Sequence, residues 1–337
     1  MKIQTRIENL KNYQIYLQVE KVVHEFLQKK GYLKVNLPVL SPALIPESYL
    51  EVFETEFIYF DKKEKLYLTS SPELFLKRLL AYGIGNCYYL GKSFRNSEPS
   101  SSLHSFEFEM LEIYKVGFNY LQLAEEVLEM LRYINKKIQN SEIKNQNDDL
   151  KFKINFDKWE KITVAQAFAK YAGIKKEELF DHQLFLEKAQ EKGYQVNSFS
   201  YEEVWSQVYV AEIEPNLGKN GYPTLIYDYP KEFAALAKLN PDGKTAQRFE
   251  FYINGVELGN CYTELTDWQQ QEKRFLEEDR KRRLAGKINH PIDKGFIEAL
   301  KYGLVDCSGI AIGLERLAMI FIGVDSIDKL KLINIET

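Results

Sequence analysis

The sequence predicts an α+β protein, built on a largely antiparallel sheet flanked by helices. Segments with strand-like alternation of apolar and polar residues occur in pairs, and short polar turns join them. Strands and helices do not alternate regularly, as they would in a doubly wound parallel sheet. The sequence also contains neither GxGxxG nor GxxxxGKS/T, so the two common glycine-rich phosphate loops are missing.

The predicted helices share apolar residues that recur at helical spacing. They are expected over residues 12–30, 71–80, 119–139, 267–284 and 314–321. Gly31 follows the first as a C-cap, Pro72 occupies the first turn of the second, and Asn119 is a plausible N-cap of the third. Residues 160–212 are expected to form mainly short helices, after a polar linker over 139–149.

The predicted strands alternate apolar and polar residues and are bounded by turn residues. They are expected over residues 31–38, 87–95, 106–116, 224–228, 248–253 and 255–264, with two more strands between 51 and 69 around a turn at 61–64. The loop between the strands at 87–95 and 106–116 carries five serines and a proline. This loop joins the two strands.

The composition excludes several classes of protein. With 337 residues, 45% hydrophobic and 14% aromatic, the chain is too apolar to be disordered. The net charge of −4 lacks the basic excess of a broad nucleic-acid-binding face. Three separated cysteines argue against a disulfide framework or a zinc site. Without a signal peptide or a membrane-spanning run in the sequence, we expect a cytoplasmic protein that does not contact a membrane.

Charged residues interrupt segments that are otherwise expected to be buried. They are Arg95, the glutamates 107, 109 and 112, Glu257, Glu264 and Arg316. A surface position or a structural ion pair explains any one of them by itself. Taken together, the arginines suit planar recognition of phosphates, and the carboxylates suit Mg²⁺ or a cationic substrate. The set points to a nucleotide together with a positively charged small molecule.

Other candidates have a simpler explanation. His104 could donate to a phosphate, or it could be a solvated loop residue. Cys87, Cys261 and Cys307 have no histidine nearby in the sequence and are expected to be inert thiols. The basic stretch 273–287 also contains acidic residues, which is typical of a solvated helix face with salt bridges.

Three segments resemble the motifs of class II aminoacyl-tRNA synthetases. GYLKVNLP at 31–38 resembles motif 1, SFRN at 93–96 with FEFEMLE at 106–112 resembles motif 2, and GIAIGLERL at 309–317 resembles motif 3. SPELFLKRLL at 71–80 is similar to the lysyl branch. EPNLG, GVELGNCYTELTD, HPID and EALKYGLVDCSGIAIG are similar to the elongation factor P–(R)-β-lysine ligase family. The resemblance extends from about residue 12 to 330 and is weakest over 139–210.

The resemblance implies a role for each matching residue. It implies that ATP is bound by Arg95, Glu98, His104, Phe108, Glu257, Leu258, Gly313 and Arg316, with Glu257 also binding Mg²⁺. Phe108 would stack on adenine, with Arg316 on its other face. It implies that the amino acid is held by Ser71, Glu73, Tyr114, Glu264 and Ala311. Arg95, Arg316 and Glu257 would serve catalysis. Ala311 stands where lysyl-tRNA synthetases tend to have glycine, and its methyl would shift preference between α- and β-lysine.

The resemblance also implies a reaction and its partners. Lysine or (R)-β-lysine would be activated as its adenylate and transferred to a lysine of elongation factor P, by a homodimer formed through motif 1. We expect one catalytic domain over residues 1–337, with a variable, largely helical insertion at 139–210 and no anticodon-binding domain. A tRNA-charging or amide-forming enzyme of lysyl or asparaginyl type is an alternative, although tRNA is less expected as a partner. The second alternative is a catalytically silent paralogue that binds an amino acid and has a regulatory role.

Four positions depart from the family pattern. Motif 2 normally reads Arg-x-Glu, whereas Ser97 stands at the second position after the arginine and Glu98 follows it. Leu103 replaces the usual basic residue, Ser105 the usual asparagine, and Glu315 the usual aspartate. Because the first three of these lie in the loop expected to handle the triphosphate, they bear directly on ATP use.

Overall fold

The computed structural model describes residues 1–97, 101–140 and 154–336, and it groups the chain into two compact units. Unit 1 contains residues 1–117, 133–151 and 265–337, and unit 2 contains residues 118–132 and 152–264. Unit 1 is therefore formed by both ends of the chain, and most of unit 2 by its middle part. The helix α3 (Tyr120–Gln139) begins in unit 2 and ends in unit 1.

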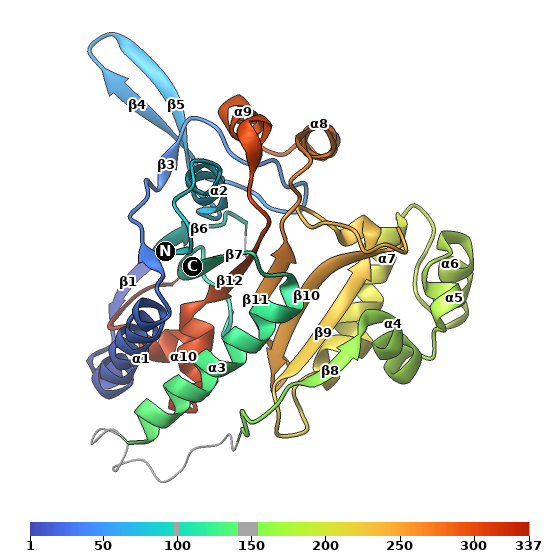
Figure 1. The fold of residues 1–337 in the computed structure, drawn as a ribbon, viewed down its shortest axis with the longest axis horizontal. Coiled ribbons are helices and arrows are strands. Elements are labelled where there is room, and N and C mark those ends of the chain that lie inside the picture. The colour runs from blue at the N-terminus through green and yellow to red at the C-terminus, as the bar shows by residue number, and fades with distance from the viewer. Residues whose placement is uncertain (98–100, 141–153, 337) are drawn as a thin grey trace. The chain divides into compact units, whose positions relative to one another are not determined.

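Antiparallel pairing dominates the strands of both units, as the sequence predicts. The strands form one eight-stranded sheet in the order β2-β6-β7-β12-β11-β10-β9-β8 (Figure 1). The bounds are β2 Leu33–Lys34, β6 Cys87–Phe94, β7 Glu107–Val116, β12 Cys307–Gly313, β11 Val256–Thr263, β10 Thr245–Ile253, β9 Thr224–Pro230 and β8 Glu160–Thr163. Parallel pairing occurs between β2 and β6 and between β8 and β9. The predicted α+β class is confirmed.

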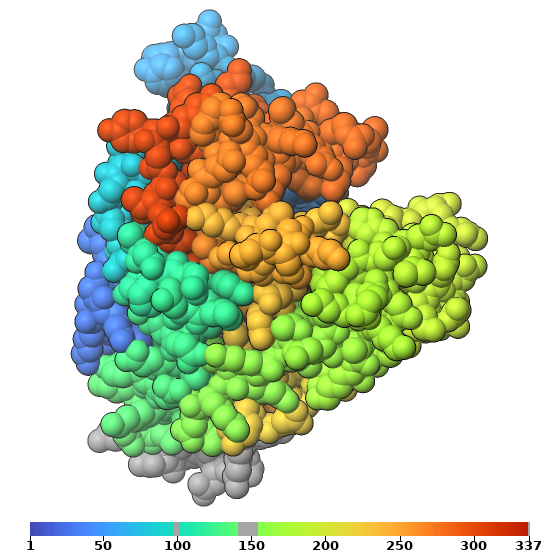
Figure 2. All heavy atoms as spheres, turned by 45° about the vertical axis from the view of Figure 1, so that its right-hand side comes forward, coloured from blue at the N-terminus to red at the C-terminus, as the bar shows by residue number. Residues whose placement is uncertain are grey.

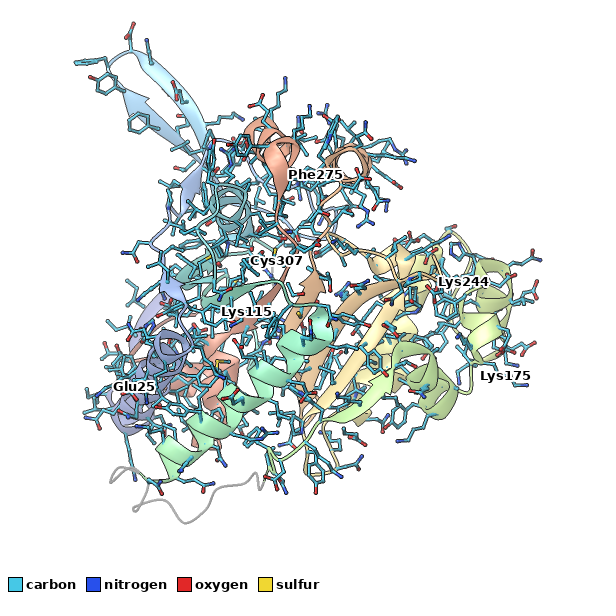
Figure 3. All side chains as sticks on the ribbon, viewed as in Figure 1. Glu25, Lys115, Lys175, Lys244, Phe275 and Cys307 are labelled. Atoms are coloured by element: carbon cyan, nitrogen blue, oxygen red, sulfur yellow. The ribbon has the colours of Figure 1, made fainter. Side chains whose placement is uncertain are left out.

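Unit 1 surrounds its part of the sheet with long helices. They are α1 (Leu10–Lys29), α2 (Glu73–Ala81), α8 (Trp268–Leu284), α9 (Lys294–Gly303) and α10 (Leu314–Ile322). α1 ends as predicted, with Gly31 at a φ of 76°, a conformation that glycine adopts without strain. α8 and α9 pack through Phe275 and Phe296, whose ring centroids are 5.6 Å apart, and Figure 3 labels Phe275 between these two helices.

Two smaller sheets complete unit 1. The first contains β3 (Leu40–Ser41), β5 (Lys62–Leu68) and β4 (Glu54–Tyr59), which confirms the hairpin predicted between 51 and 69. The tip of this hairpin projects from the surface as the light-blue spheres of Figure 2. The second sheet pairs β1 (Lys2–Thr5) with β13 (Ile333–Glu336), and so joins the two ends of the chain.

Unit 2 combines its four strands with short helices, as predicted for residues 160–212. These helices are α4 (Val164–Ala167), α5 (Lys176–Leu179), α6 (His182–Glu191) and α7 (Tyr201–Val208), with π-helical turns at Phe168–Ala172 and Tyr209–Ile213. Their apolar faces form one core with the sheet around Phe168 and Trp205, whose ring centroids are 5.1 Å apart. Single 3-10 turns lie at Ile7–Asn9, Glu214–Asn216, Lys231–Phe233 and Ile327–Leu330.

Several expectations differ from the structure or lie outside it. The predicted strand at 31–38 is reduced to the two residues of β2, because the chain leaves the sheet before Pro38. The linker predicted over 139–149 falls almost entirely outside the described residues, as does Glu98. The strand β8 lies within the segment expected to be helical. The single catalytic domain stays a prediction. No helix in the described ranges is long and apolar enough to cross a membrane.

Candidate active site

The central strands of unit 1 place the predicted amino-acid residues on one face of the sheet. Glu112 and Tyr114 lie two residues apart on β7, so their side chains point to the same side. In the register of β7 with β12, Ala311 is directly opposite Glu112, and Gly313 is directly opposite Met110. Figure 3 labels Lys115 and Cys307 near the other end of these two strands. Because residues directly opposite each other share a face, Ala311 and Gly313 belong to the same surface as Glu112.

Ser71, Glu73, Lys77, Glu112 and Tyr114 form a group at this face, which we call the carboxylate cluster. The Ser71 hydroxyl donates to Oε2 of Glu112 at 2.8 Å, and the Tyr114 hydroxyl donates to Oε1 at 2.9 Å. Ser71 also accepts a hydrogen bond from the backbone N–H of Glu73, at 3.1 Å. Lys77 forms an ion pair with Oε1 of Glu73. The start of α2 and the middle of β7 are therefore tied together by polar contacts.

Burial controls the charge of Glu112. Its side chain is only 3% exposed, and burial, followed by the nearby charge of Glu73, raises its pKa to about 8. The hydrogen bonds from Ser71 and Tyr114 and the charge of Lys77 lower the pKa but do not outweigh the burial. Without a further cation, Glu112 is therefore mostly protonated at neutral pH. A cation placed beside it would favour the ionised carboxylate.

Both predicted phosphate-binding arginines are connected to the motif 2 loop. Arg95 directly precedes the loop in the sequence, and Arg316 contacts it from α10. Arg95 follows β6, its backbone N–H donates to the carbonyl of Phe106 at 2.9 Å, and its guanidinium lies 5.3 Å from the ring centroid of Phe108. Arg316 is on α10, and its Nε donates to the carbonyl of Leu103 at 3.0 Å. Arg316 thus binds the backbone of this loop directly.

His104 and Gly313 are two further residues predicted to bind ATP. His104 is exposed, and its Nδ1 lies 2.9 Å from the Ser101 hydroxyl within the same loop. A Cβ atom added at Gly313 would meet only the Arg316 side chain, at 3.8 Å, which is an ordinary contact. Space beside Gly313 is therefore available on the face that carries Glu112.

Glu315, one of the departures from the family pattern, has a clear structural partner. Its two carboxylate oxygens accept from the backbone N–H of Glu109 at 2.9 and 3.0 Å. The side chain is 6% exposed, and burial raises its pKa. Glu315 thereby links the N-terminal turn of α10, which carries Arg316, to the middle of β7.

Glu257 and Leu258 lie on β11 in unit 2, and Glu264 directly follows the end of this strand. The register of β10 with β11 shifts between Phe251 and Tyr252, which leaves Leu258 as the extra residue of a β-bulge. Bulges bend a strand and redirect the adjacent side chains, here those of Glu257 and Leu258. Glu257 is partly exposed, whereas Glu264, just beyond the other end of the strand, is only 1% exposed. The two carboxylates therefore differ in their access to solvent.

The cysteines are free and buried, as expected of inert thiols. Burial raises the pKa of the Cys87 thiol to about 12, and burial together with Glu264 raises that of Cys261. A thiol with a raised pKa is a poor nucleophile at neutral pH. Chemistry at this site therefore depends on the charged side chains.

The sequence interpretation missed two members of the carboxylate cluster. The sequence groups Glu112 with the other carboxylates that suit Mg²⁺ or a cationic substrate but assigns it no individual role, and Lys77 occurs only within the string SPELFLKRLL. The available signal was the spacing of Glu112 and Tyr114, two residues apart on one strand face. The contact with Ser71 joins residues far apart in the sequence, so no local pattern reveals it.

Comparisons with known proteins identify the family of this chain. The family model described as tRNA synthetases class II (D, K and N) matches residues 2–333. A protein of Yersinia enterocolitica named elongation factor P–(R)-β-lysine ligase is 34% identical over 90% of this chain and 89% of its own length. Its namesakes in Avibacterium paragallinarum and Buchnera aphidicola are 35% and 33% identical, each over 93% of this chain and 92% of their own length. The chain therefore belongs to the class II (D, K and N) tRNA synthetase family, among relatives named elongation factor P–(R)-β-lysine ligase.

Proposed function

We propose that this protein is an ATP-dependent ligase that activates lysine or (R)-β-lysine and transfers it to a lysine side chain of elongation factor P. The carboxylate cluster is the observation that carries the proposal. A diamino acid brings two ammonium groups, and Glu73 and Glu112 offer two carboxylates within this cluster. The names of three relatives that align along most of their length support elongation factor P as the acceptor.

Recognition of the side-chain ammonium depends on removing water from a carboxylate. Glu112 accepts two hydrogen bonds from fixed hydroxyls and is almost completely buried. An uncharged side chain in the same position would leave this polar group without compensation, and sites of this kind reject such analogues strongly. We propose that Glu264 contributes a second buried carboxylate to this recognition, as the family resemblance implies.

Activation proceeds by in-line displacement at phosphorus. The carboxylate of the amino acid attacks the α-phosphorus of ATP, the bond to the bridging oxygen breaks, and pyrophosphate leaves. The protein needs to position the two reactants and stabilise the negative charge that develops. We assign that task to the guanidinium groups of Arg95 and Arg316. The Arg316 guanidinium is anchored to the carbonyl of Leu103, whereas Arg95 is held at its backbone N–H by the carbonyl of Phe106. The Phe108 ring, with Arg95 beside it, is proposed to stack on adenine.

Glu257 suits the way that proteins hold Mg²⁺ together with a nucleotide. Within the described residues there is no group of three or more acidic, cysteine or histidine side chains that could hold a metal by itself. Magnesium in nucleotide sites is commonly bound through one or two carboxylates and the substrate's phosphates. The partly exposed Glu257, redirected by the bulge, could supply such a ligand. The ion would neutralise phosphate charge as pyrophosphate departs.

Transfer completes the reaction. The ε-amine of the acceptor lysine attacks the carbonyl carbon of the adenylate, AMP leaves, and the amine gives up a proton as the amide forms. We place the reaction in the cytoplasm, because the three free thiols suit a reducing compartment.

We also propose a homodimer that includes the terminal ribbon β1–β13. Ile3 and Ile335 lie directly opposite each other, and their side chains are 78% and 49% exposed. On the other face of the ribbon, Asn334 is 6% exposed. A ribbon whose apolar side faces outward is typical of a surface that another chain covers.

The motif 1 region adds apolar residues to this surface. Leu10 and Leu17 on α1 and Leu33 on β2 are 43%, 43% and 52% exposed. Sedimentation of the wild type should give the mass of a dimer, and Ile3→Asp with Leu17→Asp should give that of a monomer. Ile58→Asp, which changes a residue on β4 that is 60% exposed, is the control and should remain dimeric. A monomeric wild type would rule out this part of the proposal.

The activity is tested by pyrophosphate exchange with ATP over lysine, (R)-β-lysine, aspartate and asparagine. We expect exchange with lysine or (R)-β-lysine alone, followed by transfer of the labelled amino acid to elongation factor P and not to tRNA. Exchange with aspartate or asparagine alone would contradict the lysine assignment. Exchange with no amino acid would favour a silent paralogue, and transfer to tRNA would favour a charging enzyme.

A further inference from the structure

Lys77 is a buried cation to which the proposed reaction gives no role. It lies one helical turn after Glu73 on α2, and its side chain is only 2% exposed. A buried ammonium is costly unless it is paired. Its partner is Oε1 of Glu73, the residue proposed to hold an amino group of the substrate. An internal cation and a substrate cation would therefore share one carboxylate.

The local geometry limits how this carboxylate can turn. Glu73 is the first residue of α2, and its backbone N–H is held by the Ser71 hydroxyl at 3.1 Å. With Oε1 held by Lys77 and the backbone held by Ser71, the Glu73 side chain has little rotational freedom. Its second oxygen, Oε2, is the one left to face a ligand. The Glu73 side chain is 13% exposed, so it is partly open to the surroundings.

We propose, on the basis of the function proposed above, that Lys77 is a positioning residue for the amino acid substrate. It fixes Glu73 so that Oε2 faces the substrate's amino group, and its positive charge favours the ionised form of Glu112. Lys77 does not contact the reacting atoms in this scheme. It acts through the two carboxylates that bind the substrate's ammonium groups.

The effect of Lys77 on the pKa of Glu112 is one of several interactions among the titratable groups around the cluster. Glu112 and Tyr114 face the cluster from β7, and Cys87 and Tyr89 on β6 lie near enough for Glu112 to raise their pKa values. Burial of its carboxyl raises the pKa of Glu47, and the charge of Glu73 adds to this rise. Of the charges that act on Glu112, Glu73 raises its pKa and Lys77 lowers it. Removing the Lys77 charge should therefore raise the pKa of Glu112.

The test compares Lys77→Met, Lys77→Arg and the wild type in pyrophosphate exchange with whichever lysine isomer the wild type prefers. We expect Lys77→Met to raise KM for the amino acid at least about tenfold while KM for ATP stays within about twofold. The pH at which kcat/KM for the amino acid is half-maximal should move up by about 1 unit. Lys77→Arg should recover most of the affinity, and Lys63→Met, on the exposed hairpin, should match the wild type.

A double-mutant cycle keeps the test decisive if Lys77→Met folds poorly. The cycle is made in a Glu112→Gln background, which removes the effect of Lys77 on Glu112. In that background, Glu73→Gln with Lys77→Met should bind the amino acid as Glu73→Gln does without the Lys77 change. Equal affinities would support action through the two carboxylates, whereas a further loss of about tenfold on adding Lys77→Met would overturn the proposal.

The two proposals fail in different ways. A wild type that activates no amino acid would overturn the proposed function and the role of Lys77 with it. A wild type that activates lysine, with Lys77→Met unchanged in KM and pH profile, would overturn only the role of Lys77. Parallel losses for ATP and the amino acid, with no shift of the pH profile and no recovery in Lys77→Arg, would indicate a merely structural residue and overturn it as well.

Discussion

Ala311 on β12 lies directly opposite Glu112 on β7 in the antiparallel register. A single methyl group therefore borders the carboxylate that is proposed to bind the substrate's side-chain ammonium. Both residues belong to unit 1 and are held by continuous strand pairing from Cys307 to Gly313. The size of residue 311 can thus change the space beside Glu112 without changing its charge.

Ala311→Gly should shift the preference between the two lysine isomers toward α-lysine. Removing the methyl enlarges the space next to the substrate, and one methyl group in such a position is worth about 1–3 kcal/mol of discrimination. The ratio of kcat/KM for lysine to that for (R)-β-lysine, measured by pyrophosphate exchange, should rise by about tenfold or more. Ala318→Gly on α10 is a control for the general effect of losing a methyl. An unchanged ratio in Ala311→Gly would show that residue 311 does not select the isomer.

Binding of the amino acid should strengthen as pH rises toward 8. Burial raises the pKa of Glu112 to about 8, so the substrate-free carboxyl is protonated below this pH. An ammonium beside it lowers that pKa, and substrate binding therefore releases a proton. The affinity should rise by up to about tenfold per pH unit below pH 8 and level off above it. Calorimetry in buffers of different ionisation enthalpy measures the proton directly.

Glu112→Gln is the matched control for this pH dependence. The amide keeps the shape and does not titrate. Its oxygen can accept from one of the two hydroxyls of Ser71 and Tyr114, and its NH2 group can donate to the other. We expect weaker binding of lysine with little pH dependence between 6 and 9. A wild type whose affinity is constant over this range would contradict the assignment of the ammonium to Glu112.

Periodicity predicted the elements that have one buried face, and it failed where tertiary contacts decide. The helix α1 and the pair β6–β7 follow from regular apolar spacing and were found where expected. The ribbon β1–β13 was missed because it joins the two ends of the chain and turns apolar residues outward. The helix α9 was missed although Phe296, Ile297 and Leu300 repeat at helical spacing.

The site was predictable only in part for the same reason. Motif resemblance identified Ser71 and Tyr114, but the residue that joins them is Glu112, and that contact depends on how α2 meets β7. The role of Glu315 also becomes clear only in the structure. In the sequence Glu315 is a departure from the family pattern, whereas in the structure its carboxylate accepts from the backbone N–H of Glu109. Strand register and buried ion pairs are relations between distant segments, which a local pattern does not encode.

Arg316→Ala should abolish pyrophosphate exchange. The guanidinium is proposed to stabilise charge on the phosphates, and losing one such preorganised group typically costs about 10²–10³ in kcat. It also anchors the carbonyl of Leu103, so the motif 2 loop would lose a contact. Arg283→Ala is the control, because that guanidinium on α8 is 62% exposed and pairs only locally with Asp279. Exchange at the wild-type rate in Arg316→Ala would refute the role taken from motif 3.

Glu315→Ala should destabilise the fold as well as the site. The carboxylate accepts twice from the N–H of Glu109 and lies in the first turn of α10, where a negative charge is favourable. Its removal leaves a strand N–H without its partner, so the free energy of unfolding should fall by about 1–3 kcal/mol. Glu315→Asp keeps the charge on a shorter side chain and should lose less. Denaturant titration measures the difference, with the exposed Glu277→Ala on α8 as the control. If Glu315→Ala unfolds at the same denaturant concentration as Glu277→Ala, then Glu315 does not hold β7 to α10 energetically, and its contact with Glu109 is incidental.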